Sequence, residues 1–333
     1  MRGTRDRAAA VQPSRPDAPR YRHAVVTGGA GFVGSHLCAE LLDRGTEVTC
    51  VDDLCTAHPD HVRVLTGRPG CTLLRADVTE PFSVAQPVDL VLHFASPASP
   101  ADYLRLPLHT LETGSLGTRN ALALAREHGA RFILASTSEV YGDPLEHPQS
   151  ERYWGNVNPV GPRSVYDEAK RFAEALTVAE AEVHGTDAGI VRLFNTYGPR
   201  MRGHDGRAVP TFIRQALAGE PLTVTGDGRQ TRSLTYVADT VAGVLAMAGS
   251  DLRGPVNIGN PDEITMLDLA RLVIRLAGSS SGVRLIDRPT DDPMVRCPDI
   301  TLARGKLQWE PRVTAPDGLA RTIAWFRARE RGD

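Results

Sequence analysis

The segment from His23 to Leu42 constrains the fold more than any other part of this 333-residue chain. A short apolar run ending at Thr27 leads directly into Gly28-Gly-Ala-Gly31-Phe-Val-Gly34, and a helical pattern follows. Glycines let the backbone turn sharply from a strand into a helix and approach a ligand closely. The free N–H groups at the helix N-terminus then stabilise an anion such as a pyrophosphate. We therefore predict a dinucleotide-binding turn, with its contacts at Gly28, Gly31, Phe32, Val33 and Gly34.

Apolar runs continue to alternate with helical patterns as far as about Ile190, which is typical of βαβ units and a parallel sheet. The predicted strands are His23–Thr27, Glu47–Asp52, Thr72–Ala76, Leu90–Phe94, Arg131–Ser136 and Ala188–Leu193. We therefore predict an α/β fold with a doubly wound parallel sheet of the Rossmann type and a smaller C-terminal substrate-binding domain.

The sequence pattern changes after Tyr197, where Pro and Gly residues separate shorter segments. One amphipathic helix is expected over Thr265–Leu276, with its buried side at Leu267, Leu269, Ile274 and Leu276. The predicted organisation is a disordered tail over residues 1–20, an NAD-binding domain over 21–196 that also takes in 227–258, and a substrate-binding domain over 197–226 and 259–330.

Composition excludes several classes of protein. The chain is 41% hydrophobic with a net charge of −2, so it has material for a large core but no broad basic field for nucleic acid. No run approaches ~20 apolar residues, so we expect no membrane span. The N-terminal segment has no apolar run of the signal-peptide type, which favours the cytoplasm. The five cysteines form no C-x-x-C pair, so we predict neither a metal site nor a disulfide framework.

An acidic residue at the end of the second predicted strand specifies the cofactor. Asp52 follows the glycines by about 20 residues, where a carboxylate accepts hydrogen bonds from the adenosine ribose and repels a 2′-phosphate. We therefore predict NAD rather than NADP, with Asp77 and Val78 at the adenine. The glycine spacing resembles that of the short-chain dehydrogenase/reductase superfamily, and the predicted cofactor contacts also include Ala95 and Thr113.

The predicted chemical centre combines a tyrosine, a lysine and a hydroxyl. Tyr166 and Lys170 lie four residues apart and therefore on one face of a helix. The ammonium stabilises a phenolate, which makes the tyrosine a usable general base or acid. A strand-end segment upstream supplies Thr137, Ser138 and Glu139. The combination resembles the catalytic set of extended short-chain dehydrogenases/reductases.

A resemblance to one family covers almost the whole chain after the tail. The segments that carry it include His93-Phe-Ala95-Ser-Pro97, Tyr153-Trp154, Gly161-Pro-Arg163, Phe194-Asn195, Gly198-Pro-Arg200-Met201, Asp205-Gly-Arg207, Gln230-Thr-Arg232, Arg296 and Pro298-Asp-Ile300. They resemble the UDP-glucuronate decarboxylases, also called UDP-xylose synthases. This resemblance implies a UDP-sugar substrate, a homodimer, and substrate contacts at Tyr103, Asn195, Arg200, Arg207, Arg232 and Arg296.

The same resemblance implies a mechanism. Related dehydratases carry an Asp-Glu pair after the catalytic Thr, whereas this chain has Ser138-Glu139 and so lacks the proton donor that dehydration needs. Tyr166 takes the proton of the carbon 4 hydroxyl while NAD removes hydride, and the resulting β-keto acid loses carbon dioxide. Arg296 is placed at the substrate carboxylate, Ser138 or Glu139 assists at carbon 5, and returned hydride gives UDP-xylose.

The chain departs from the family pattern at two neighbouring positions. Glu112 and Gly114 stand where the family usually has Lys and Asn, and we hypothesise that some UDP-4-keto-pentose and NADH escape before reduction. Asp53 also replaces the usual Asn. Two alternatives stay open: a nucleotide-sugar 4-epimerase or 4,6-dehydratase of the same fold, and a catalytically silent NAD-binding regulator.

Overall fold

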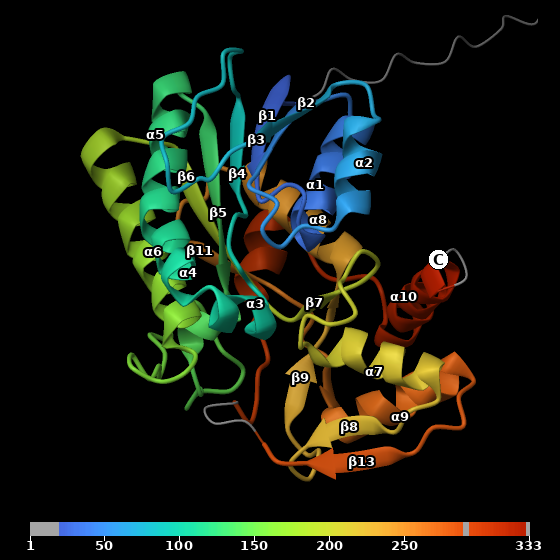
Figure 1. Ribbon diagram of the computed structural model, residues 1–333. Helices are drawn as coiled ribbons and strands as arrows, with labels where there is room; N and C mark the ends of the chain where they lie inside the picture. The colour runs from blue at the N-terminus through green and yellow to red at the C-terminus, as the bar shows by residue number, and fades with distance from the viewer. Residues whose placement is uncertain (1–19, 289–292, 331–333) are drawn as a thin grey trace, which may run out of the picture.

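Seven parallel strands form the central sheet of the computed structural model, which describes residues 20–288 and 293–330 (Figure 1). Their spatial order is β11-β6-β5-β4-β1-β2-β3. The bounds are β1 His23–Thr27, β2 Glu47–Asp52, β3 Cys71–Arg75, β4 Leu90–His93, β5 Arg131–Thr137, β6 Ala188–Leu193 and β11 Pro255–Ile258. The predicted doubly wound sheet is confirmed, and β11 extends it beyond the six predicted strands. Of the predicted tail, all but Arg20 lies outside the described residues.

Helices cover both faces of the sheet, because β1, β4 and β5 are buried along their whole length. One face carries α1 (Phe32–Asp43), α2 (Pro59–Thr66) and α8 (Val237–Ala248). The other carries α5 (Thr118–His128) and α6 (Ser164–His184), together with α3 (Pro100–Arg105), α4 (Pro107–Glu112) and the π-helical segment η1 (Thr113–Gly117). Among the described residues, no helix has both the length and the apolar content to cross a membrane.

The strand order sets the position of the site. β1 pairs with β2 on one side and β4 on the other, so the chain reverses direction across the sheet at β1. Ligands of such sheets bind in the crevice at the carboxyl ends of the strands beside this reversal. Gly28, Asp52 and Thr137 lie at three of these strand ends.

The C-terminal part of the chain forms a smaller body, seen in the lower half of Figure 1. It contains α7 (Ala208–Ala218), α9 (Met266–Ala277) and α10 (Ala315–Glu330). Short strand pairs accompany them: β7 (Thr196–Tyr197) with β10 (Thr235–Tyr236), β8 (Leu222–Thr225) with β13 (Val283–Ile286), and β9 (Thr231–Ser233) with β12 (Glu263–Thr265). Two further segments are η2 (Ser138–Tyr141) and η3 (Ala303–Leu307).

The predicted helix over Thr265–Leu276 corresponds to α9, with Thr265 as its N-cap accepting from Asp268 N at 3.0 Å. Its predicted buried side is correct at Leu269, but Leu267, Ile274 and Leu276 are only half-buried. The buried positions are Met266, Leu269, Ala270, Leu272, Val273 and Ala277. α9 packs against α7, α10 and β8, and these neighbours set a rotation that the apolar pattern alone does not specify.

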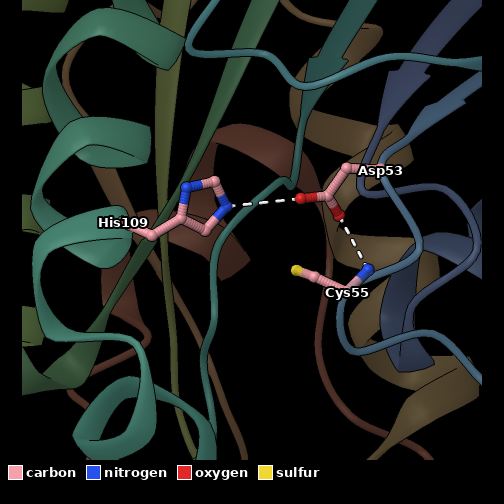
Figure 2. Close-up of side chains that lie close together, drawn as sticks. All are labelled: Asp53, Cys55 and His109. Carbon is pink, nitrogen blue, oxygen red and sulfur yellow. Dashed lines mark hydrogen bonds and ion pairs between the residues drawn. The ribbon is translucent and has the colours of Figure 1, made fainter.

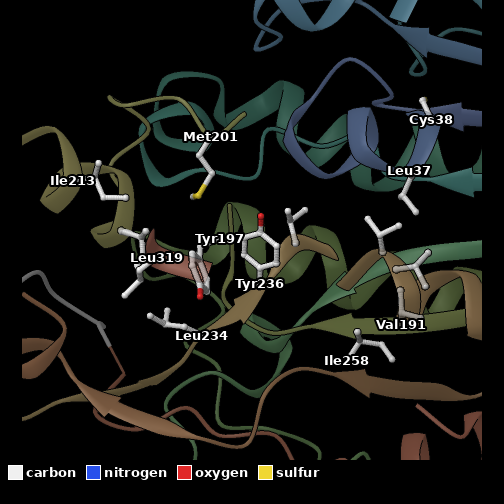
Figure 3. Close-up of a cluster of buried hydrophobic side chains, with 14 of the residues drawn as sticks. Leu37, Cys38, Val191, Tyr197, Met201, Ile213, Leu234, Tyr236, Ile258 and Leu319 are labelled. Carbon is white, nitrogen blue, oxygen red and sulfur yellow. The ribbon is translucent and has the colours of Figure 1, made fainter. Parts of the chain in front are cut away.

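One hydrophobic cluster connects the sheet with the smaller body (Figure 3). It runs from Leu37 on α1 and Val191 on β6 to Tyr197, Ile213 and Leu319 in the C-terminal part. Because these side chains share a core, the two parts hold one crevice between them. The predicted domain boundaries themselves stay a prediction.

Gly114 lies where η1 meets α6. A Cβ built on it would lie 2.7 Å from the Cβ of Ala169 and 2.8 Å from its carbonyl oxygen. We expect Gly114→Ala to lower the free energy of unfolding by about 1–3 kcal/mol, because overpacking forces the two helices apart. Urea unfolding measures this. Gly254→Ala is the control, since no atom of the described residues lies within 4 Å of its added Cβ. Equal losses in both variants would contradict this explanation.

Candidate active site

A pocket opens at the carboxyl edge of the sheet and is lined by both parts of the chain. All predicted cofactor residues line it: Gly28, Gly31, Phe32, Val33, Gly34, Asp52, Asp77, Val78, Ala95, Thr113, Tyr166 and Lys170. The predicted side chains therefore converge, although they come from six separate segments of the sequence.

The glycine turn has the geometry that a pyrophosphate requires. Gly28 adopts a left-handed φ of +67°, and a Cβ on Gly34 would lie 2.1 Å from the carbonyl oxygen of Gly28. The N-cap of α1 is Gly31, which makes no side-chain cap hydrogen bond. The first turn of α1 thus presents backbone N–H groups to the pocket, so the site fits an anionic group.

Asp52 is held at the end of β2 by two backbone donors. Its carboxylate oxygens accept from Ala30 N and Leu54 N, each at 2.9 Å. Burial raises the pKa of Asp52, while these two hydrogen bonds oppose the shift. Each oxygen keeps a further lone pair, so the carboxylate can also accept from ribose hydroxyls. The residues present fit NAD.

Tyr166 lies in a buried stack inside the pocket. Its ring is nearly parallel to that of Tyr103, with centroids 5.4 Å apart, and Thr137 lines the same pocket beside it. Burial, and after it the charge of Glu139, raises the pKa of Tyr166 well above its usual value, while the Thr137 hydroxyl lowers it. The tyrosine is therefore protonated until further positive charge reaches it.

Lys170 is the buried cation beside this tyrosine. Its Nζ lies 5.9 Å from the centre of the Tyr166 ring and donates to the carbonyl oxygen of Ala135 at 2.9 Å. Burial lowers the pKa of Lys170 to about 8, against the opposing charge of Glu174. The ammonium is thus present at neutral pH and close enough to stabilise a phenolate.

Glu139 joins two arginines beneath the pocket. It accepts from Arg163 Nη2 at 2.6 Å and forms a second ion pair with Arg296. Burial alone would raise the pKa of Glu139, but the two guanidinium groups lower it instead. Arg296 also donates to the carbonyl oxygen of Gly142 at 3.1 Å, and its Nε has no partner among the described residues.

The predicted substrate residues fall into two groups. Asn195, Arg200 and Arg207 line the pocket, whereas Tyr103, Arg232 and Arg296 do not. Tyr103 and Arg296 instead support Tyr166 and Glu139 from behind.

The polar residues that line the pocket differ in whether their side chains already have hydrogen-bond or ion-pair partners within the protein. Within residues 20–288 and 293–330, the side-chain oxygen of Asn195 is buried without a partner, so it has an acceptor to offer a ligand. Arg207 is paired with Asp205 at 2.5 Å, and Arg200 donates to the carbonyl oxygen of Ser35 at 2.8 Å.

Two arginines at the site were not assigned a role from the sequence. Arg163 holds Glu139, and Arg202 lines the pocket while paired with buried Asp102. Arg163 stands three residues before Tyr166 in the sequence, and this short spacing is the one sequence feature that points to a place near the chemical centre. For Arg202 there was no such signal, because its partner comes from another segment.

The crevice, the glycine turn and the Tyr–Lys pair define a dinucleotide-dependent enzyme of the short-chain dehydrogenase/reductase type. The model of the NAD dependent epimerase/dehydratase family matches residues 24–259, and the chain belongs to this family.

Curated relatives narrow the comparison to UDP-glucuronic acid decarboxylases. The chain is 49% identical over 306 residues to UDP-glucuronic acid decarboxylase 1 of Xenopus tropicalis, covering 92% of this chain and 72% of the relative. It is also 49% identical to UDP-glucuronic acid decarboxylase 6 of Arabidopsis thaliana, covering 92% of this chain and 89% of the relative.

Solved structures share the fold at lower identity. UDP-glucose 4-epimerase of Thermotoga maritima superposes with a TM-score of 0.86 at 27% identity, covering 92% of this chain and 99% of that one. UDP-glucuronic acid 4-epimerase of Bacillus cereus, solved with UDP-glucuronic acid and NAD, gives 0.82 at 27% identity with the same coverage. The architecture is therefore one on which a bound NAD and a UDP-sugar are found together.

Proposed function

We propose that this protein is a UDP-glucuronic acid decarboxylase that uses NAD and forms UDP-xylose. The observation that carries the proposal is the pocket itself, in which Thr137, Tyr166 and Lys170 adjoin a Ser138-Glu139 pair backed by Arg296. The decarboxylase relatives support the same reaction.

The first half of the reaction is an oxidation at carbon 4. NAD bound along the glycine turn supplies a reversible hydride acceptor and, through its positively charged ring, a field that favours a phenolate. Tyr166 accepts the proton of the carbon 4 hydroxyl, Lys170 stabilises the resulting negative charge, and Thr137 orients the tyrosine.

The second half breaks the bond between carbons 5 and 6. Carbon dioxide leaves, and the electron pair of that bond passes to the carbon 4 ketone as an enolate, to which Tyr166 donates a hydrogen bond. Carbon 5 then regains a proton from a water held by Ser138 or Glu139, and carbon 4 regains hydride while its oxygen takes back the proton from Tyr166. We assign Arg296 to the substrate carboxylate once its ion pair with Glu139 opens, because in this structure Arg296 lies behind Glu139 and does not line the pocket.

Incubation with UDP-glucuronic acid and NAD tests the reaction. Mass spectrometry should show loss of carbon dioxide and a UDP-pentose product. A product of unchanged mass with inverted carbon 4 would instead establish the 4-epimerase, which the similarity to the Bacillus cereus enzyme keeps as the second candidate. No change in any sugar would favour the silent regulator.

We also propose that part of the product leaves as UDP-4-keto-pentose, because Glu112 and Gly114 stand where the family usually has a cation and an amide that could support the return of hydride. NADH absorbance should then rise in proportion to keto product. Glu112→Lys restores the cation beside the pocket-lining Thr113 and should lower both the keto product and the NADH. UDP-xylose as the sole product, with no NADH, would contradict this proposal.

A homodimer through α6 and its neighbours is the proposed assembly. Exposed apolar side chains gather on α3, α4, η1 and α6: Leu104, Leu108, Leu111, Leu116 and Phe172. We expect Phe172→Glu to convert a dimer to a monomer in analytical ultracentrifugation, because it places a charge in an apolar contact. Val64→Glu on α2, on the opposite face of the sheet, is the matched control and should stay dimeric. A monomeric parent protein would overturn the proposal.

The proposed compartment is the cytoplasm. All five cysteines are free thiols, and three of them are buried, which suits a reducing environment. We further propose that residues 21–196 with 227–258 bind NAD, and that 197–226 with 259–330 cover the sugar.

A further inference from the structure

Asp53, Cys55 and His109 face one another across the pocket (Figure 2). Asp53 and Cys55 belong to the loop after β2, whereas His109 comes from α4 on the other side, and all three line the pocket. Nε2 of His109 lies 3.3 Å from Oδ2 of Asp53. Oδ1 of Asp53 accepts from the backbone N of Cys55 at 2.9 Å, so Oδ2 is the oxygen directed at His109.

Imidazole, thiolate and carboxylate together are the donor set of zinc sites. Their potential ligand atoms here all lie within 4.8 Å of one another. Tetrahedral zinc with ligand distances of ~2.0–2.3 Å separates its ligand atoms by about 3.3–3.8 Å. The His109 to Asp53 distance is already of this size. Cys55 is exposed and lies in a loop, so its Sγ has room to approach by about 1 Å.

The local field favours a cation. The carboxylates of Asp52, Asp53 and Asp77 line the pocket together with Cys55. Their negative charge attracts a divalent ion, and a bound ion deprotonates a coordinating thiol.

A second carboxylate lies behind the histidine. Nδ1 of His109 is 4.0 Å from Oδ2 of Asp77, while Oδ1 of Asp77 is held by Thr79 through its backbone N and its hydroxyl, at 2.9 and 2.8 Å. This separation is longer than a hydrogen bond, so Asp77 acts on His109 through its negative charge, which raises the basicity of a metal-binding histidine.

We propose that Asp53, Cys55 and His109 bind a thiophilic divalent cation such as Zn²⁺, and that this ion competes with the dinucleotide. Three protein ligands leave a fourth position open toward the pocket. Asp52 and Asp77, the predicted adenosine contacts, line the same pocket beside the three ligands. The ion would tie the β2 loop to α4 where the adenosine half of NAD is expected, which is a property beyond the proposed reaction.

Co²⁺ is the probe for the site, because a Co²⁺–thiolate bond has a charge-transfer absorption in the near ultraviolet. Titration of the untagged full-length chain, with its NAD content measured, should produce this band. Cys55→Ser and His109→Gln should remove it, Asp77→Asn should weaken Co²⁺ binding about tenfold, and Cys71→Ser on β3 should leave it unchanged. A missing band in the parent protein, or a band that survives Cys55→Ser, would overturn the site.

Competition is tested separately from any sugar chemistry. Added NAD should displace Zn²⁺ to a chromophoric chelator, and Zn²⁺ should raise the apparent Kd for NAD by the same factor, as linkage requires. Independent binding of the two would refute the competition. Neither readout depends on decarboxylation, so failure of the proposed reaction would not be mistaken for failure of the metal site.

Discussion

Replacing Tyr166 by Phe is expected to lower the rate of carbon dioxide release by about 10²- to 10⁴-fold, the range that a positioned general acid or base contributes. The substitution removes only the hydroxyl. The phenyl ring keeps its stacking on Tyr103 at the 5.4 Å centroid spacing, so the pocket and NAD binding should be retained.

The control for this variant is Tyr21→Phe, which removes a hydroxyl that donates to the carbonyl oxygen of Ala248, outside the pocket. NAD affinity and carbon dioxide release should be measured for both proteins. If both variants release carbon dioxide at the parent rate, the Tyr166 hydroxyl has no role in the chemistry and the proposed mechanism is wrong.

Replacing Arg296 by Met should affect both stability and activity. Arg296 is only 2% exposed and shares Glu139 with Arg163, so its loss leaves a buried carboxylate with one partner instead of two. Breaking a buried ion pair from one side costs about 3–5 kcal/mol, and the remaining Arg163 contact favours the lower end. Urea unfolding should show this loss.

A second variant separates the structural role of Arg296 from its catalytic one. Arg296→Lys keeps a cation beside Glu139 and should lose less stability than Arg296→Met. Because an ammonium cannot hold a carboxylate bidentately, kcat/KM for UDP-glucuronic acid should stay low in this variant. Recovery of activity together with stability would show that Arg296 only supports the fold.

Much of the cofactor side was predictable, because its signals are local. Asp52 at a strand end and the Tyr166–Lys170 spacing each lie within one element, and the glycine turn joins two consecutive ones, so periodicity and backbone geometry determine the outcome. Parallel strands then bring their carboxyl ends to one edge, so residues placed at those ends meet whatever the details of packing.

The rotation of α9 and the surroundings of Arg296 were not predictable in the same way. The apolar pattern of α9 is compatible with several rotations of the helix about its axis. Packing against neighbouring elements selects the rotation that buries Ala270 and Val273 and leaves Ile274 and Leu276 half-buried. Arg296 was expected at a substrate carboxylate, yet its first contact in the structure is Glu139, a residue far away in the sequence.

By itself, the sequence determined the doubly wound sheet, the family and the residues at the strand ends, since each follows from short-range spacing or from many matched segments together. Only the tertiary structure decided which charges share a partner and which polar atoms have none. The Glu139–Arg163–Arg296 group and the Asp53–Cys55–His109 cluster both arise where distant segments pack side by side. Such contacts depend on the sum of packing over the whole core, which no local pattern encodes.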